Sequence, residues 1–255
     1  MAGPIVDILM YHSVSQAGGA TSIAPDVFAM QMQAIADAGV PVITLDDLLA
    51  AREGGFALAP RSVILTFDDG FQDFADAAWP VMARHGFRAI VYLPTGYVGC
   101  KEGWRGIGSP PRRLMGWDAL SDLSGQGVAF GSHTHSHPDL TSLDDAAVTA
   151  ELVRSRRIIE DRLGSPVRHI APPYGLADAR VRRLIGQHYR TSVSTVLASA
   201  GPGDDPLDLP RVEMFYFTDP RRWRAHLAGR GAAYLRSRRI LRAMKARLMK
   251  PWSGI

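Results

Sequence analysis

Short apolar runs alternate along the chain with segments whose apolar residues recur at helical spacing. The runs that predict strands are residues 5–10, 40–44, 62–66, 89–93, 129–131 and 167–171. The segments that predict helices are residues 25–38, 45–52, 74–85, 117–126 and 142–163. This rhythm is typical of parallel strands joined by crossover helices, so it predicts an α/β fold, either a β/α barrel or an open sheet.

Polar capping residues and glycines mark the expected helix boundaries. A short polar side chain before a helix can accept a hydrogen bond from a free N–H of the first turn, and glycine readily adopts the conformation that ends a helix. The expected N-caps are Asp26, Asp46 and either Thr141 or Ser142. The expected helix ends are Gly39, Gly86 and Gly164.

The composition of the 255-residue chain is that of an ordinary globular protein, with 46% hydrophobic and 21% charged residues. Cys100 is the only cysteine, which excludes an intramolecular disulfide and a zinc site built from several cysteines. Any metal must therefore bind His, Asp or Glu. The first residues lack a basic region and include Asp7, and no run of about 18 apolar residues occurs, so we expect a cytoplasmic protein.

Positive charge is concentrated at the C-terminal end. Residues 219–255 carry 11 Lys or Arg and one acid, whereas the whole chain has a net charge of +4. We therefore expect a domain over 1–218 and a basic amphipathic tail over 219–255, helical from about residue 220. Residues 231–250 place apolar side chains at helical spacing among the basic ones, which suits peripheral contact with an anionic membrane or packing on the domain itself. Interleaved aromatic residues are missing, so a nucleic-acid partner is not expected.

Two local motifs carry candidate chemistry. Asp68, Asp69 and Gly70 follow an apolar strand, where one carboxylate can bind a metal while its neighbour remains a free base. A plain turn or helix cap is the alternative. His133, His135 and His137 follow a second strand, and imidazole is a good ligand for zinc, cobalt and nickel. His133 and His137 are the natural pair, since residues four apart share a face if the segment is helical.

In this order and separation, Thr66-Phe67-Asp68-Asp69-Gly70 and His133-Thr134-x-x-His137 resemble the first two motifs of the polysaccharide deacetylases, the NodB-homology enzymes of carbohydrate esterase family 4. Residues 116–120, 171–175 and 209–212 extend the resemblance, which covers about residues 5–215. The opening Leu9-Met10-Tyr11-His12-Ser13-Val14 resembles a subgroup similar to poly-N-acetylglucosamine deacetylases.

The resemblance implies a distorted (β/α) barrel that hydrolyses an N-acetyl group from an amino sugar with one divalent metal ion, zinc above all. Carried over by position, Asp69, His133 and His137 are the implied metal ligands and Asp68 the general base. The backbone N–H of Tyr174 is implied to complete the oxyanion hole. An N-acetylated saccharide, polymeric or lipid-linked, is the implied substrate.

The sequence departs from the family pattern in two places. Ala171 stands where much of the family has an arginine that orients the base, and we expect Arg211 to supply that charge from another strand. The usual late Leu-x-His motif, source of the general acid, is absent, and the only late histidine is His226 in the basic tail. We expect His12 to act as the acid instead, with a buried, hydrogen-bonded histidine as the alternative.

Residues 99–113 form a Gly/Pro-rich connection that we expect at the active-site end of a barrel. Trp104 in this loop is the candidate platform for a sugar ring, whereas Trp117 opens a predicted helix and is expected in the core. Two rival functions remain open. One is removal of another acyl group, formyl or O-acetyl, and the other is a carbohydrate-binding pseudoenzyme.

Overall fold

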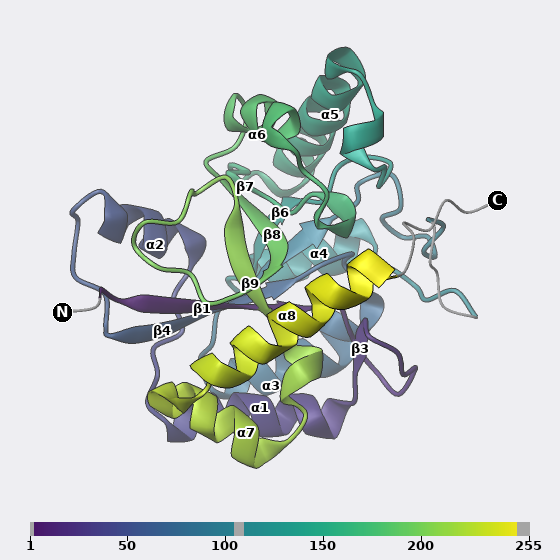
Figure 1. The fold of residues 1–255 in the computed structure, drawn as a ribbon. Coiled ribbons are helices and arrows are strands. Elements are labelled where there is room, and N and C mark those ends of the chain that lie inside the picture. The colour runs from purple at the N-terminus through teal and green to yellow at the C-terminus, as the bar shows by residue number, and fades with distance from the viewer. Residues whose placement is uncertain (1–2, 105–109, 249–255) are drawn as a thin grey trace.

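A closed barrel of seven parallel strands forms the centre of the protein, as the computed structural model of residues 3–104 and 110–248 shows (Figure 1). In barrel order the strands are β1 (Ile5–Tyr11), β4 (Arg61–Phe67), β5 (Ile90–Leu93), β6 (Ala129–Ser132), β7 (His169–Ile170), β8 (Thr191–Leu197) and β9 (Leu209–Glu213). Pairing of β9 with β1 closes the barrel, and β2 (Ser13–Val14) with β3 (Ser22–Ile23) forms a separate two-stranded sheet. The predicted β/α barrel is confirmed.

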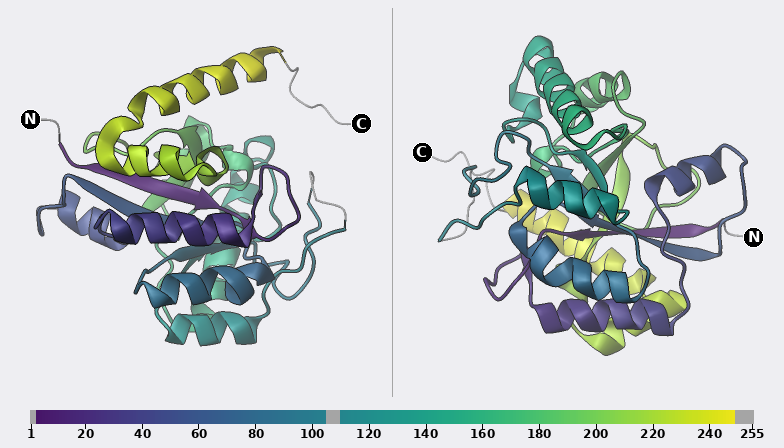
Figure 2. Two further views of the ribbon diagram at one scale, coloured as in Figure 1. Left: turned by 90° about the horizontal axis from the view of Figure 1, so that it is seen from below. Right: turned by 180° about the vertical axis from the view of Figure 1, so that it is seen from behind.

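Helices surround the strands (Figure 2). They are α1 (Pro25–Asp37), α2 (Leu45–Arg52), α3 (Trp79–Arg84), α4 (Trp117–Gly125), α5 (Asp145–Leu163), α6 (Ala179–Gly186), α7 (Pro220–Ala225) and α8 (Ala232–Leu248). Short 3-10 or π turns span Phe74–Ala78, Leu140–Ser142, Pro173–Gly175, Met214–Phe217 and His226–Arg230. The helical tail expected from about residue 220 is present as α7, the turn that follows it and α8.

Alternation along each strand separates two hydrophobic clusters. Leu65 and Phe67 of β4 pack in the larger cluster together with helical residues such as Phe28. Ile64, between them in sequence, belongs to a second cluster with Tyr92 of β5. Successive strand residues point to opposite faces, so β4 is buried on both sides and reads as a continuous apolar run.

Several predicted boundaries are wrong. The N-caps are Ala24, Thr44 and Asp144. Thr44 and Asp47 form a reciprocal capping box, which leaves the expected cap Asp46 inside the first turn. Asp26 likewise lies in the first turn of α1, and the expected caps Thr141 and Ser142 belong to a 3-10 turn that precedes α5. The glycine predictions are confirmed, since Gly39, Gly86 and Gly164 all have positive φ beyond helix ends.

No apolar run indicates β8, β9 is expected only as the strand that carries Arg211, and one predicted strand is absent from the barrel. Residues 40–44 form only an isolated bridge between Val42 and Val63, next to Pro41, which has no N–H to donate. β8 escaped detection because Ser192 and Ser194 are polar yet buried. β9 is short and contains a proline and an arginine, so it shows no apolar run.

The C-terminal segment packs on the barrel. Trp223 of α7 is fully buried and donates a hydrogen bond from Nε1 to the carbonyl oxygen of Gln31, at 3.0 Å. Leu235 of α8 is buried as well, whereas Ile240 and Leu241 remain about half exposed. Within the described residues, no helix is long and apolar enough to cross a membrane. The division of the chain at residue 218 stays a prediction.

A buried polar cluster fastens this segment to the first strand. Asp7 of β1 is fully buried and forms ion pairs with Arg61 of β4 and, at 3.1 Å, with Nε2 of His226. The hydroxyl of Ser199 also donates to Asp7. Burial alone disfavours the ionised carboxylate, but His226 and Arg61 outweigh it and hold the pKa of Asp7 below its ordinary value of 3.8.

We predict that Asp7→Asn lowers the free energy of unfolding at pH 7 by about 3 kcal/mol, because Arg61 loses its buried counter-charge. Urea unfolding measures the loss. Asp145→Asn is the control, since its ion pair with Arg180 is exposed and should contribute under about 1 kcal/mol. A lowered carboxyl pKa stabilises the fold above the unfolded-state pKa, so the deficit should shrink as the pH falls below 3.8. Equal urea midpoints for wild type and Asp7→Asn would contradict this role.

Candidate active site

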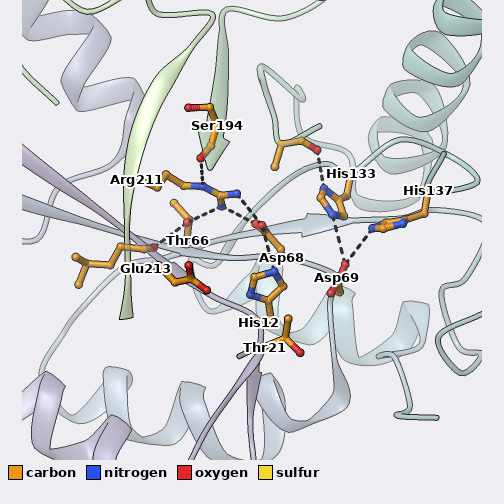
Figure 3. A network of polar contacts seen from close by, with 12 residues as sticks. His12, Thr21, Thr66, Asp68, Asp69, His133, His137, Ser194, Arg211 and Glu213 are labelled. Atoms are coloured by element: carbon orange, nitrogen blue, oxygen red, sulfur yellow. Dashed lines mark hydrogen bonds and ion pairs between the residues drawn. The ribbon is translucent and has the colours of Figure 1, made fainter. Parts of the chain in front are cut away.

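The register of β1 and β4 sets His12 beside Asp68. Tyr11 and Phe67 are paired as the last residues of the two strands, and the N–H of Asp68 donates to the carbonyl oxygen of Tyr11 at 2.9 Å. The chain therefore leaves both strands at the same level. His12 Nε2 lies 3.8 Å from Asp68 Oδ2 (Figure 3), and the His12 side chain is 18% exposed.

Arg211 of β9 is the counter-charge of Asp68. Its Nη1 and Nη2 donate to the two carboxylate oxygens of Asp68 at 2.7 and 2.8 Å, and its Nε donates to the carbonyl oxygen of Ser194. Both side chains are buried. Burial disfavours the ionised carboxylate, but the charge and hydrogen bonds of Arg211 outweigh it and keep the pKa of Asp68 below its ordinary value. The structure thus places Arg211 where the sequence analysis expected it.

Asp69, His133 and His137 form a compact cluster of metal-ligand type. The Nε2 atoms of both histidines lie 3.4 Å from Oδ1 of Asp69, and one donor atom from each residue fits within a 4.8 Å span. All three side chains are buried. Burial raises the pKa of Asp69, but hydrogen bonds from His133 and His137 outweigh this effect and hold it far below its ordinary value.

The two histidines do not share a helix face. Residues 133–137 are a loop after β6 in which Thr134 and His137 have positive φ angles of 66° and 57°. His133 is oriented by a 2.6 Å hydrogen bond between its Nδ1 and the carbonyl oxygen of Ala171. This contact directs Nε2 toward Asp69, the arrangement typical of a metal-binding histidine.

Backbone strain is concentrated here. Within the described residues, four non-glycine residues have positive φ, namely Asp69, Thr134, His137 and Tyr174. Such conformations are costly and persist only where the surrounding structure enforces them. Three of these residues, Asp69, His137 and Tyr174, line one cavity, so the enforced conformations are gathered around it.

The cavity at this end of the barrel has a volume of about 320 Å³. It is lined by Met10, His12, Thr21, Asp68, Asp69, Trp104, Arg112, His133, His137, Tyr174, Gly175, Thr195, Glu213 and Arg242. The Trp104 ring stacks on His137 with centroids 4.3 Å apart. Gly175 permits a close approach, because a Cβ there would meet Thr195 at 2.3 Å. The turn that carries Tyr174 can therefore lie directly against β8.

Other residues singled out in the sequence lie partly inside and partly outside the cavity. His135 lies outside the metal-type cluster and is hydrogen-bonded through Nδ1 to Thr95. Trp117 packs against the hydrophobic core, as expected. The centre of the Gly/Pro-rich loop, residues 105–109, lies outside the described residues. Glu213 and Arg242 also line the cavity, and no local pattern predicts this, because the two residues meet across 29 positions of sequence.

Comparisons with known proteins agree with this geometry. Residues 57–192, more than half of the chain, match the family described as polysaccharide deacetylase. The poly-beta-1,6-N-acetyl-D-glucosamine N-deacetylase of Staphylococcus epidermidis is 23% identical over 219 residues, which cover 82% of this chain and 73% of that protein. Several other curated relatives match over less than half of their own length.

Solved structures share the fold. IcaB from Ammonifex degensii superposes with a TM-score of 0.74 at 22% identity, over 91% of this chain and 99% of that one. The Streptococcus pyogenes deacetylase PplD, solved in complex with acetate, gives a TM-score of 0.72 at 24% identity over 82% of this chain and 92% of its own. At these identities the likeness establishes the barrel fold.

We predict that the chain binds about one Zn²⁺ or Co²⁺ per molecule, because three buried donors of suitable type converge. His137→Ala and Asp69→Ala should each weaken binding at least about 100-fold in titration calorimetry. His135→Ala removes a histidine from the same loop but not from the cluster, so its affinity should equal that of the wild type. Equal affinities for His137→Ala and His135→Ala would exclude this cluster as the site.

Proposed function

This chain belongs to the polysaccharide deacetylase family, and from that premise we propose that it is a metal-dependent hydrolase that removes N-acetyl groups from an amino sugar in a polysaccharide or a lipid-linked saccharide. One observation carries the proposal. A carboxylate held ionised by a buried arginine, Asp68, lies beside a separate cluster of three metal-ligand side chains, within one cavity. A binding module has no need for this pairing.

The donor set fits a divalent ion of the zinc, cobalt or nickel type. Two imidazole nitrogens and one carboxylate oxygen match the ligand preference of these metals, and a three-residue set leaves positions for water and substrate. Asp69, His133 and His137 would hold the ion. When bound, it would polarise the amide carbonyl and lower the pKa of a water molecule.

Asp68 is suited to accept the proton that the attacking water loses. Its pKa is low, so it is ionised at neutral pH, and Arg211 fixes both of its oxygens in place. A base that is already oriented lowers the entropic cost of the reaction. The backbone N–H of Tyr174, on the strained turn after β7, is the proposed donor to the developing oxyanion.

His12 is the proposed general acid. Breakage of the C–N bond releases acetate and an amine, and the amine nitrogen must gain a proton as it leaves. His12 lines the cavity on the Asp68 side and is partly exposed, so it can reach both the carboxylate and a bound substrate. The partial exposure of His12 argues against the alternative that it is only a buried, hydrogen-bonded histidine.

The substrate's anchoring and the cellular location stay predictions. About half of the surface of Ile240, Leu241 and Met244 on α8 is exposed, which supports the proposal that residues 231–250 contact an anionic membrane from the cytoplasm. The side chains beyond residue 244 and residues 249–250 lie outside the described part of the chain. Removal of formyl or O-acetyl groups is compatible with the same cavity. An assay that identifies the released product distinguishes these activities from N-deacetylation.

We predict that Asp68→Asn lowers kcat at least about 100-fold on an N-acetylglucosamine oligomer, because the water loses its base. His12→Ala should lower kcat at least about 100-fold as well, since the amine then leaves unprotonated. Acetate release measures both effects. His85→Ala is the control and should retain wild-type kcat, because the His85 ring stacks on Phe87 and neither residue lines the cavity.

Wild-type kcat in Asp68→Asn would rule out the assigned base, and wild-type kcat in His12→Ala would rule out the assigned acid. Release of formate or of an O-linked acetate, with no N-acetyl hydrolysis, would replace the proposed activity with the alternative acyl group. Binding of oligomer without any hydrolysis by the metal-loaded wild type would favour the pseudoenzyme.

A further inference from the structure

We propose that Arg242 of α8, together with Glu213 of β9, binds hydroxyl groups of the saccharide, so that the C-terminal helix is part of the substrate site. The identity of the ligand as a saccharide rests on the proposed function. The participation of the helix rests on contacts of this chain alone. Arg242 and Glu213 both line the cavity that contains His12 and Asp68.

The first turns of α8 fix its position on the barrel. Leu235 is buried in the main hydrophobic cluster. The hydroxyl of Tyr234 donates to the carbonyl oxygen of Tyr216 at 2.9 Å, and Arg238 Nε donates to that same hydroxyl at 3.1 Å. Before the helix begins, His226 is tied to Asp7 inside the barrel wall. The direction of α8 is therefore set by buried contacts.

Helical spacing brings Arg242 to the inner side. Leu235, Arg238 and Arg242 are three and four residues apart, so they lie along one face of the helix. The contacts of Leu235 and Arg238 show that this face is turned to the barrel. α8 contacts β8 and crosses the barrel obliquely near β9 (Figure 1), and its inner face carries Arg242 to Glu213, the last residue of β9.

Glu213 receives Arg242 at the cavity wall. Nη1 of Arg242 lies 2.9 Å from Oε2 of Glu213, and the two side chains are 37% and 15% exposed. Glu213 is the last residue of β9 and is paired in register with Met10, two residues before His12. Figure 3 shows Glu213 on one side of the His12–Asp68 pair and His137 on the other.

This ion pair is suited to a neutral, hydroxyl-rich ligand. A partly exposed ion pair of this kind contributes little to the stability of the fold. Among the described residues, Arg242 donates a side-chain hydrogen bond only to Glu213, and none of them accepts from its Nε or Nη2. Neighbouring hydroxyls of a sugar can accept from Arg242 and donate to Glu213 at once.

Arg112, the other arginine that lines the cavity, is already engaged by neighbouring side chains and is less able to bind a sugar hydroxyl. Arg112 already donates to both carboxylate oxygens of Glu102, and its guanidinium lies 4.0 Å from the centre of the Phe71 ring. Across the cavity from Glu213, Trp104 is stacked on His137 and offers an aromatic surface. Polar groups at one wall and an aromatic ring at the other are a typical arrangement for a sugar.

The test compares Arg242→Ala with Arg239→Ala in the full, metal-loaded chain. Arg239 lies on the same helix, is exposed and lines a different cavity, so its replacement removes the same charge elsewhere. With an N-acetylglucosamine pentamer as the probe, Arg242→Ala should raise KM about 10-fold and change kcat less than about twofold. The KM of Arg242→Lys should lie between those of the wild type and Arg242→Ala, because lysine keeps the positive charge but lacks the paired N–H donors of the guanidinium.

Equal KM values for Arg242→Ala and Arg239→Ala would overturn the inference, as would a change confined to the melting temperature. Binding of the pentamer by calorimetry in an Asp68→Asn background should weaken by the same factor of about 10. Wild-type KM should also change less than about twofold with ionic strength. A steep rise would show that Arg242 binds an anionic group and would overturn recognition of neutral hydroxyls.

The two proposals fail in different ways. A wild-type chain that neither binds nor hydrolyses any N-acetylated saccharide would refute the proposed function. A wild type that deacetylates the pentamer, with Arg242→Ala indistinguishable from Arg239→Ala, would refute only the role of the helix.

Discussion

The buried ion pair between Asp68 and Arg211 is the constraint on which the site depends. A lone carboxylate buried in the barrel would take up a proton, and a protonated acid could not act as a base. Arg211 prevents this by donating two hydrogen bonds to the carboxylate from β9, on the far side of β1 from β4. Closure of the barrel through the β9–β1 pairing is therefore required for the proposed chemistry as well as for the fold.

The parallel arrangement of the barrel strands explains how the site is assembled. Every strand delivers its C-terminal end to the same rim, so groups far apart in sequence meet there. His12 leaves β1, Asp68 and Asp69 leave β4, and His133 follows β6. The opposite end of the barrel has a separate role, since the cluster of Asp7 and His226 ties the C-terminal segment in place and so sets the course of α8.

Features that short sequence motifs or periodicity mark could be predicted, whereas side-chain pairs formed by residues far apart in sequence could not. Asp68, Asp69, His133 and His137 are marked by short motifs at strand ends, and the barrel follows from alternating periodicity. Arg211 was placed only through a motif resemblance. Nothing local distinguishes Arg242 from the other basic residues of the tail, and His226 carries no sign that it pairs with Asp7. Strand β8 was missed because its buried serines resemble a loop.

The central claim is that a divalent ion held by Asp69, His133 and His137 enables hydrolysis of an N-acetyl amide at Asp68. The most direct measurement follows acetate and free amine together, by proton NMR, in an N-acetylglucosamine oligomer treated with metal-loaded, chelator-stripped and reloaded protein. Our account predicts equal amounts of acetate and amine from the loaded protein, none from the stripped protein, and recovery on reloading. Equal rates from the loaded and stripped proteins, or acetate without amine, would contradict it.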